Sequence, residues 1–203
     1  MGRKKILHNR DSLILDAACL LFSKTSYERT TLDDIAFQAG ISKGSIYLEF
    51  PSKEEILYQL LQRFKAQELA DMRRIAAKKS GSPLGQLKTM LVHNMGTIYD
   101  SMQQTQLSME DLMQSREHLY ERLKPFIEAR LSLIESLLER AETAGEIPPL
   151  NGQQAHKAHL IMLALRGVLP PYREGTPRNH LQAEGAELLD LVLNGLRHHA
   201  ATV

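Results

Sequence analysis

The chain has 203 residues, of which 43% are hydrophobic, so it is long enough to bury a substantial core. Its 25 Lys and Arg residues balance 24 Asp and Glu residues, and a formal net charge of +1 gives no whole-chain signal for a nucleic-acid partner. The single cysteine excludes a disulfide framework, and no apolar run approaches the ~18 residues of a membrane span. We therefore expect a cytoplasmic protein that does not enter the membrane.

Helical periodicity dominates the chain. Apolar residues recur at three- and four-residue steps nearly everywhere, whereas strand-like alternation bounded by turn residues does not occur. The sequence therefore predicts an all-α fold of about nine helices. The first helix is expected over residues 11–24, where an apolar stripe runs from Leu13 to Phe22.

Two short helices follow, and both have recognisable ends. Thr31 with Asp34 three residues on can cap the start of the second helix, and Gly40 supplies its exit. Ser42 can cap a third helix over residues 43–50. We therefore expect two short helices joined by a tight turn.

The remaining helices are longer. Pro51 cannot continue the third helix, and Ser52 with Glu55 forms a capping box that opens a fourth helix, expected to reach residue 79. The breaker-rich loop 80–85 is the expected seam after it. Further helices are expected at about 84–102, 108–115, 117–144 with a kink near Pro125, 153–169 and 178–198.

Residues 31–50 match a helix-turn-helix, in which the third helix of the domain enters the major groove of DNA. Ala36 lies where the two helices cross, and Ile46 ties the recognition helix to the core. The basic N-terminal segment, with Arg3, Lys4, Lys5 and Arg10, either reaches along a groove or forms a solvated terminus.

The start of the third helix carries groups suited to DNA. Ser42, Lys43 and Ser45 offer hydrogen bonds, and Gly44 among them allows close approach of the backbone to a phosphate or base edge. Tyr47 presents a hydroxyl one turn further on. Lys53 opens the fourth helix, where free backbone amides and the helix dipole already favour a phosphate.

Residues 12–58, above all TTLDDIAFQAGISKGSIYLEFPSKEEIL, resemble the DNA-binding domain of the TetR family of bacterial transcriptional regulators. The resemblance covers roughly a quarter of the chain. It implies a homodimer with a helix-turn-helix DNA-binding domain over 1–51. It also implies an effector-binding and dimerisation domain over 52–203, with the helix at 52–79 linking the two.

The resemblance also assigns the contacts with double-stranded DNA. They fall on Thr31, Ser42, Lys43, Gly44, Ser45, Tyr47 and Lys53, with Tyr47 and Lys53 on phosphates. Many relatives carry aromatic residues or His at the positions of Leu48 and Glu49. Leu48 could contact a thymine methyl and Glu49 a cytosine amino group, or both could point away from the groove.

The resemblance places a small-molecule effector among the helices of the C-terminal domain. Methionines suit a pocket for apolar ligands, and one face of the fifth helix adds polar groups. The candidate effector-binding residues are Met90, His93, Asn94, Thr97, Met109 and Met113. Core packing explains the methionines equally, and the polar face could be surface.

The last two helices carry more apolar surface than one helix face requires, which is typical of a subunit interface. The candidate interface residues of the homodimer are Met162, Leu165, Leu188 and Val192. Burial within one subunit is the alternative explanation.

We expect no catalytic residues, metal or cofactor. His156 and His159 lie three apart, but no thiol or carboxylate set completes a metal-ligand pattern, and no phosphate-cradling motif is present. The expected function is repression from a palindromic operator that the effector relieves. The alternative is a structural or chromosome-organising DNA-binding protein without a small-molecule response.

Overall fold

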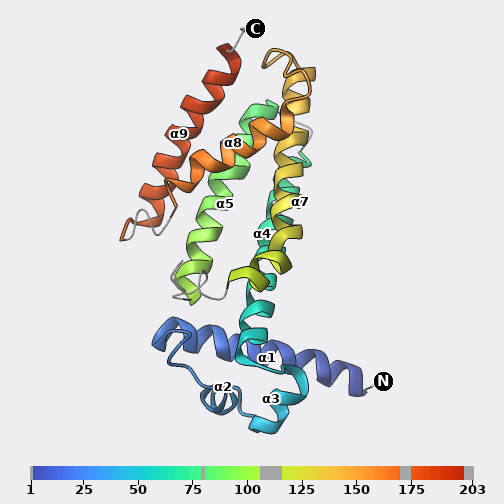
Figure 1. Ribbon diagram of the computed structural model, residues 1–203, viewed down its shortest axis with the longest axis vertical. Coiled ribbons are helices and arrows are strands. Elements are labelled where there is room, and N and C mark those ends of the chain that lie inside the picture. Colours follow the sequence, from blue (N-terminus) through green and yellow to red (C-terminus); the bar gives the residue numbers. More distant parts are fainter. Residues whose placement is uncertain (1, 79–80, 106–115, 170–174, 199–203) are drawn as a thin grey trace. The chain divides into compact units, whose positions relative to one another are not determined.

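The computed structural model describes residues 2–78, 81–105, 116–169 and 175–198. Within these ranges the chain is entirely helical, which confirms the all-α prediction (Figure 1). The eight described helices are α1 (Gly2–Thr25), α2 (Leu32–Ala39), α3 (Lys43–Glu49), α4 (Lys53–Ala76), α5 (Pro83–Thr105), α7 (Arg116–Thr143), α8 (Gln154–Arg166) and α9 (Arg178–His198). The helix expected at 108–115, with Met109 and Met113, lies outside the described residues.

Helix α1 differs from the prediction, because it begins at Gly2 rather than near residue 11. The segment from Arg3 to Thr25 contains no Pro or Gly, so nothing in it interrupts the helix. The helix ends at Thr25, and Ser26 follows with a left-handed φ of 72°. The basic N-terminal segment is therefore part of α1.

The chain forms two compact units. Unit 1 comprises residues 1–65 with 101–120, and unit 2 comprises residues 66–100 with 121–203. The boundary falls within α4, because the first half of that helix packs with α1 to α3. The functional division at residue 51 remains a prediction.

Unit 1 has its own core. The side chains that are completely buried there are Ile14, Ala18 and Phe22 from α1, Ile35 from α2, Ile46 from α3, and Ile56 and Leu60 from α4. Burying one such large aliphatic or aromatic side chain stabilises the fold by about 1.5–3 kcal/mol. Each of the two short helices is thus held by one isoleucine, which fixes the face that it turns outward.

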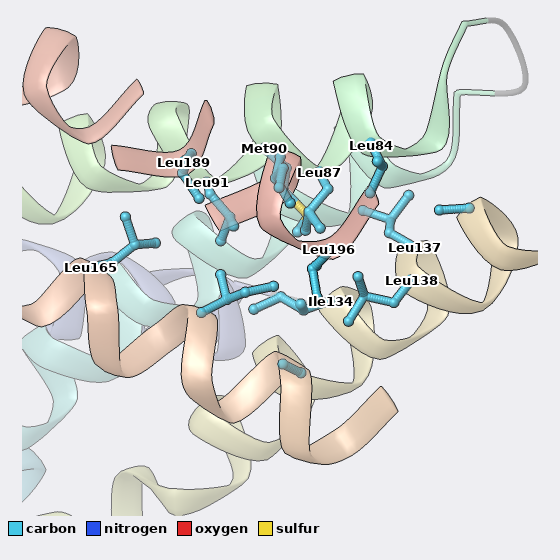
Figure 2. Close-up of a cluster of buried hydrophobic side chains, with 14 of the residues drawn as sticks. Leu84, Leu87, Met90, Leu91, Ile134, Leu137, Leu138, Leu165, Leu189 and Leu196 are labelled. Carbon is cyan, nitrogen blue, oxygen red and sulfur yellow. The ribbon is translucent and has the colours of Figure 1, made fainter. Parts of the chain in front are cut away.

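Unit 2 packs α5, α7, α8 and α9 around a second core (Figure 2). The buried residues on α5 follow a helical stripe, through Leu84, Leu87 and Leu91. Residues of the other helices in the same cluster include Ile134, Leu137 and Leu138 of α7, Leu165 of α8, and Leu189 and Leu196 of α9. Within this unit α5 and α7 run in opposite directions (Figure 1).

Helix α9 lies closely along α5. A Cβ atom at Gly185 would stand 2.3 Å from the Met95 methyl carbon, so a larger residue there would require the end of the flexible Met95 side chain to move. The ammonium of Lys88 pairs with Asp190 at 2.6 Å, which ties the two helices together. The position of α9, and of the surface that it presents, is therefore set by α5.

Candidate nucleic-acid interface and effector site

Helix α2 is closed at both ends by local hydrogen bonds. The Thr31 hydroxyl accepts from the Asp34 amide at 3.2 Å, and the Asp34 carboxylate accepts from the Thr31 amide at 2.9 Å. The Asp34 carboxylate also accepts from the Thr31 hydroxyl at 2.7 Å, and this bond, together with the one from the Thr31 amide, lowers the pKa of Asp34. Gly40 ends the helix with a φ of 68°, and its N–H is directed to the carbonyl oxygens of Ala36 and Phe37. The predicted capping box is confirmed, and Thr31 is engaged in it.

Helix α3 begins at a Ser42 cap. The Ser45 amide donates to the Ser42 hydroxyl at 3.1 Å, and the two hydroxyls lie 2.9 Å apart. Ile46 faces the core and is fully buried. Both serine side chains therefore stand at the exposed start of the recognition helix, where polar groups can reach DNA.

The orientation of Ile46 determines which residues face outward. Gly44 and Leu48 are two residues away in either direction, about 200° around the helix, and so lie on the opposite side. A Cβ atom at Gly44 would meet only the Ser42 hydroxyl, at 3.8 Å, so the space above it is open. Leu48 is 78% exposed. The outward face of α3 is therefore centred on Gly44 and Leu48.

Two predicted contacts flank this face. Tyr47 is 52% exposed, so its ring and hydroxyl are accessible. The ammonium of Lys43 pairs with the Asp33 carboxylate at 2.7 Å, an exposed ion pair that raises the pKa of Lys43. Exposed ion pairs of this kind are weak, so a phosphate can compete for the ammonium.

Glu49 is not on the outward face. Its carboxylate lies 3.5 Å from the Arg10 guanidinium, and only 14% of its side chain is exposed. The structure thus favours local pairing of Glu49 over a contact with a base. Leu48, by contrast, is directed outward.

Lys53 is held by the turn that follows α1. Its ammonium donates to the carbonyl oxygens of Tyr27 at 2.8 Å, Thr30 at 2.9 Å and Glu28 at 3.3 Å. Burial lowers the pKa of Lys53. These carbonyl bonds were not foreseen from the sequence, which had suggested a phosphate as the partner of this ammonium.

Sequence reasoning also missed Phe37, which is 90% exposed on α2. It lies two residues from the buried Ile35, about 200° around the helix, so helical periodicity alone could have placed it on the solvent side.

The candidate effector residues on α5 differ in how deeply they are buried. Met90 is fully buried in the core of unit 2, and Asn94 is 3% exposed. The Thr97 hydroxyl donates to the backbone carbonyl of Asn94 at 2.9 Å. His93 lies nearer the surface, with its ring 3.7 Å from the Asp71 carboxylate of α4.

The candidate interface residues also differ in burial. Leu165 is 2% exposed and belongs to the core of unit 2, so it packs within the chain. Met162, Leu188 and Val192 are partly buried against the same core. The large apolar side chains that α8 and α9 leave exposed are Leu160, Leu163 and Leu191, which were not predicted from the sequence.

Two negative findings apply to the described residues. No group of three or more His, Cys, Asp or Glu side chains among them is arranged to hold a metal ion. None of the described helices is both long enough and apolar enough to cross a membrane.

Together, the fold and α3 define a class of protein: an all-α chain whose N-terminal unit is a helix-turn-helix DNA-binding domain. Residues 14–60 match the family model for bacterial regulatory proteins, tetR family. The N-terminal part of the chain is therefore similar to the DNA-binding domain of the TetR family.

Two curated relatives align over most of the chain. The HTH-type transcriptional repressor BepR of Brucella suis is 27% identical over 195 residues, which cover 93% of this chain and 91% of BepR. The fatty acid metabolism regulator protein of Bacillus subtilis is 28% identical over 142 residues, covering 66% and 69% of the two chains. Two other Bacillus subtilis regulators, 31% and 36% identical, match over only 27% and 20% of their own length.

The crystal structure of FadR from Bacillus subtilis in complex with stearoyl-CoA has a similar fold. The TM-score is 0.71 at 23% sequence identity, and the alignment covers 91% of this chain and 98% of FadR.

Proposed function

We propose that the protein is a sequence-specific transcriptional repressor that binds a palindromic operator as a homodimer and is released by a small molecule bound in unit 2. The outward face of α3 carries the proposal. It combines the open backbone at Gly44 with the exposed Leu48 and Tyr47, and the stretch SKGSIYL contains no acidic residue that would repel phosphates. An adjacent acid, Glu49, is paired with Arg10.

The proposed DNA contacts are those assigned by the resemblance. Some of these residues are free to reach DNA, whereas others already make local interactions. Ser42, Ser45, Gly44 and Tyr47 lie at the start or on the exposed sides of α3. Lys43 would exchange its ion pair for a phosphate, whereas Thr31 would contact DNA while capping α2. Lys53 is the exception, because three backbone carbonyls already bind its ammonium, and we propose a structural role for it instead of a phosphate contact.

The homodimer would form through α8 and α9. Leu160, Leu163 and Leu191 are exposed there beside the partly buried Met162 and Val192, which together make an apolar surface. A two-fold interface uses the same surface on both subunits, and it would present two recognition helices to half-sites about 34–36 Å apart.

The effector component rests on the relatives and on buried polar groups in unit 2. A similar fold holds stearoyl-CoA in FadR, and a small molecule that prefers one separation of the two recognition helices would shift the population by its differential affinity. Asn94 in the interior of unit 2 offers a polar group to such a molecule.

Selection of bound sequences from random duplex DNA tests the DNA part of this proposal. The expected result is an inverted repeat with half-sites about one helical turn apart. Recovery of unrelated sequences would contradict it. A compound panel added to the selected operator then tests effector response, and a constant affinity throughout would indicate a DNA-binding protein without a ligand.

A further inference from the structure

The hydrophobic core of unit 2 ends where four helices each bring a polar residue. On α4 and α7 that residue lies one turn before a buried core residue, and on α5 and α8 it is adjacent to one. The four residues, called the polar layer below, are Glu68, Asn94, Arg130 and Arg166.

The register of the helices brings these residues to one end of the core. Because α5 and α7 run in opposite directions (Figure 1), residues after Leu91 on α5 lie at the level of residues before Ile134 on α7. Figure 2 shows Leu84 and Leu137 towards one end of the cluster and Leu91 and Leu165 towards the other. Glu68 of α4 and Arg166 of α8 are near enough to Arg130 for their charges to act on its pKa, and Arg166 is exposed, so it stands at the outer side of this group.

Two hydrogen-bond donors of the polar layer are buried without a partner. Asn94 is 3% exposed, and its Nδ2 has no hydrogen-bond partner among the described residues. The Nε of Arg130 is likewise buried and unpaired within the described part of the chain. Burial lowers the pKa of this guanidinium. A buried donor that makes no hydrogen bond destabilises the folded state, so its presence needs an explanation.

The type of the two unpaired donor atoms and the local charge limit which chemical classes of molecule can bind here. An amide N–H and a guanidinium N–H can only donate, so the partner must supply acceptor atoms. The buried guanidinium of Arg130, with the exposed guanidinium of Arg166 near it, favours an anion over a cation. The neighbouring side chains are apolar and include Met90 and Met95, whose flexible thioethers can repack around a ligand.

We propose that Asn94 and Arg130 bind the carboxylate of an effector whose remaining body is apolar and packs against the methionine-containing end of the core. This inference rests on the proposed function, because it names the chemical class of the effector. Asn94 would supply one hydrogen bond to the carboxylate, and Arg130 would supply a second together with its charge.

Three probes that share one alkyl chain and differ only in the head group test the proposed preference for a carboxylate. Decanoate, decanol and decyltrimethylammonium are titrated into the full-length protein, without DNA and below their micelle concentrations, by isothermal calorimetry. Decanoate is expected to bind at least about tenfold more tightly than decanol, because hydrogen bonds to charged groups are the stronger class. The cation is expected not to bind.

Substitution of Asn94 distinguishes a ligand-binding role from a structural one. Asn94→Leu is expected to weaken decanoate binding about ten- to hundredfold, to leave decanol within about twofold, and to raise the melting temperature of the free protein, since it removes an unpaired buried amide. A purely structural asparagine would instead make the Leu variant less stable. Asn94→Asp, which has nearly the same shape, is expected to bind decanoate even less well, because it replaces the donor by a like charge.

The role of Arg130 is tested with a double variant. Arg130→Met would leave the Glu68 carboxylate buried beside an apolar group, so it is combined with Glu68→Gln. The double variant is expected to lose the preference for decanoate over decanol. Thr89→Val on the same helix as Asn94 is the control, because that exposed hydroxyl is bonded to the backbone carbonyl of Gly85, and it should leave both affinities unchanged.

The inference is overturned if decanoate does not bind, if the three probes bind alike, or if Asn94→Leu leaves decanoate affinity intact. Operator affinity, measured separately, keeps the two proposals apart. If decanoate binds through Asn94 without changing operator affinity, the inference stands and effector release fails. If another compound releases the operator equally well from the Asn94→Leu and Arg130→Met/Glu68→Gln variants, effector release stands and the inference fails.

Discussion

The ammonium of Lys53 donates a hydrogen bond to the backbone carbonyl of Tyr27 at 2.8 Å and lies 4.4 Å from the centroid of the same residue's ring. The ring in turn packs edge-to-face on Phe22, which is fully buried in the core of unit 1. Lys53 therefore connects the start of α4 to the end of α1, on either side of the helix-turn-helix.

Lys53→Met is predicted to lower the free energy of unfolding of the protein by about 1.5–3 kcal/mol, because it removes hydrogen bonds from a charged donor to several carbonyls. Chemical denaturation followed by circular dichroism measures this loss. The slope of log affinity for DNA against log salt concentration should remain unchanged. A slope that falls by about one, with stability intact, would instead show that Lys53 contacts a phosphate.

Leu48→Ala is predicted to weaken operator binding about three- to tenfold, because Leu48 is exposed on the outward face of α3 and suits the methyl group of thymine. Fluorescence anisotropy with thymine and uracil versions of the selected operator identifies the contact. The variant should lose nothing further when the methyl groups are removed. Phe37→Ala, which removes a comparably exposed apolar side chain from α2, is the comparison, and equal losses in both variants would contradict a specific role for Leu48.

Thr31→Ala is predicted to destabilise unit 1 by about 1 kcal/mol near neutral pH, because it removes the cap of α2. The hydrogen bonds from Thr31 hold the pKa of Asp34 below its ordinary value of 3.8, so ionised Asp34 contributes stability that is present above that value. This contribution is lost as the pH falls from 3.8 through the lower pKa of the folded state. Thermal melts at pH 7 and at pH 3 or below should therefore show a smaller difference between variant and parent in acid. A constant difference would contradict this coupling.

Leu191→Lys is predicted to yield monomers that bind the palindromic operator at least about tenfold more weakly, because Leu191 is 69% exposed on α9 in the proposed interface. Analytical ultracentrifugation measures the oligomeric state. Leu13→Lys, which places the same charge at an exposed leucine of unit 1, is the control and should leave the oligomeric state unchanged. An unaltered dimer in the Leu191 variant would place the interface elsewhere.

The features predicted correctly from the sequence depend on interactions over a few residues. Thr31 and Ser42 cap helices through amides three residues away, and Gly40 ends α2 because it readily adopts a positive φ. Apolar periodicity likewise located the long helices of unit 2, although their ends differ by a few residues.

The features that sequence reasoning missed depend on distant segments. The carbonyls that bind Lys53 lie 23 to 26 residues earlier, and the Arg10 partner of Glu49 comes from α1. Leu165 and Leu163 are equally apolar, and only the packing of α8 against α5 and α9 decides that one is buried and the other exposed. Long-range packing of this kind leaves no local pattern in the sequence.

We propose that the outward face of α3 binds the operator, and the variant Gly44→Glu places a negative charge at the centre of that face. The position has open space above it, so the variant should fold while its carboxylate opposes the phosphates. Operator affinity is measured by fluorescence anisotropy for Gly44→Glu and for Ser132→Glu, which adds the same charge at an exposed position of unit 2. We expect a loss of operator affinity of about a hundredfold or more for Gly44→Glu and of less than about threefold for Ser132→Glu. Equal affinities of a folded Gly44→Glu variant and the parent protein would contradict it.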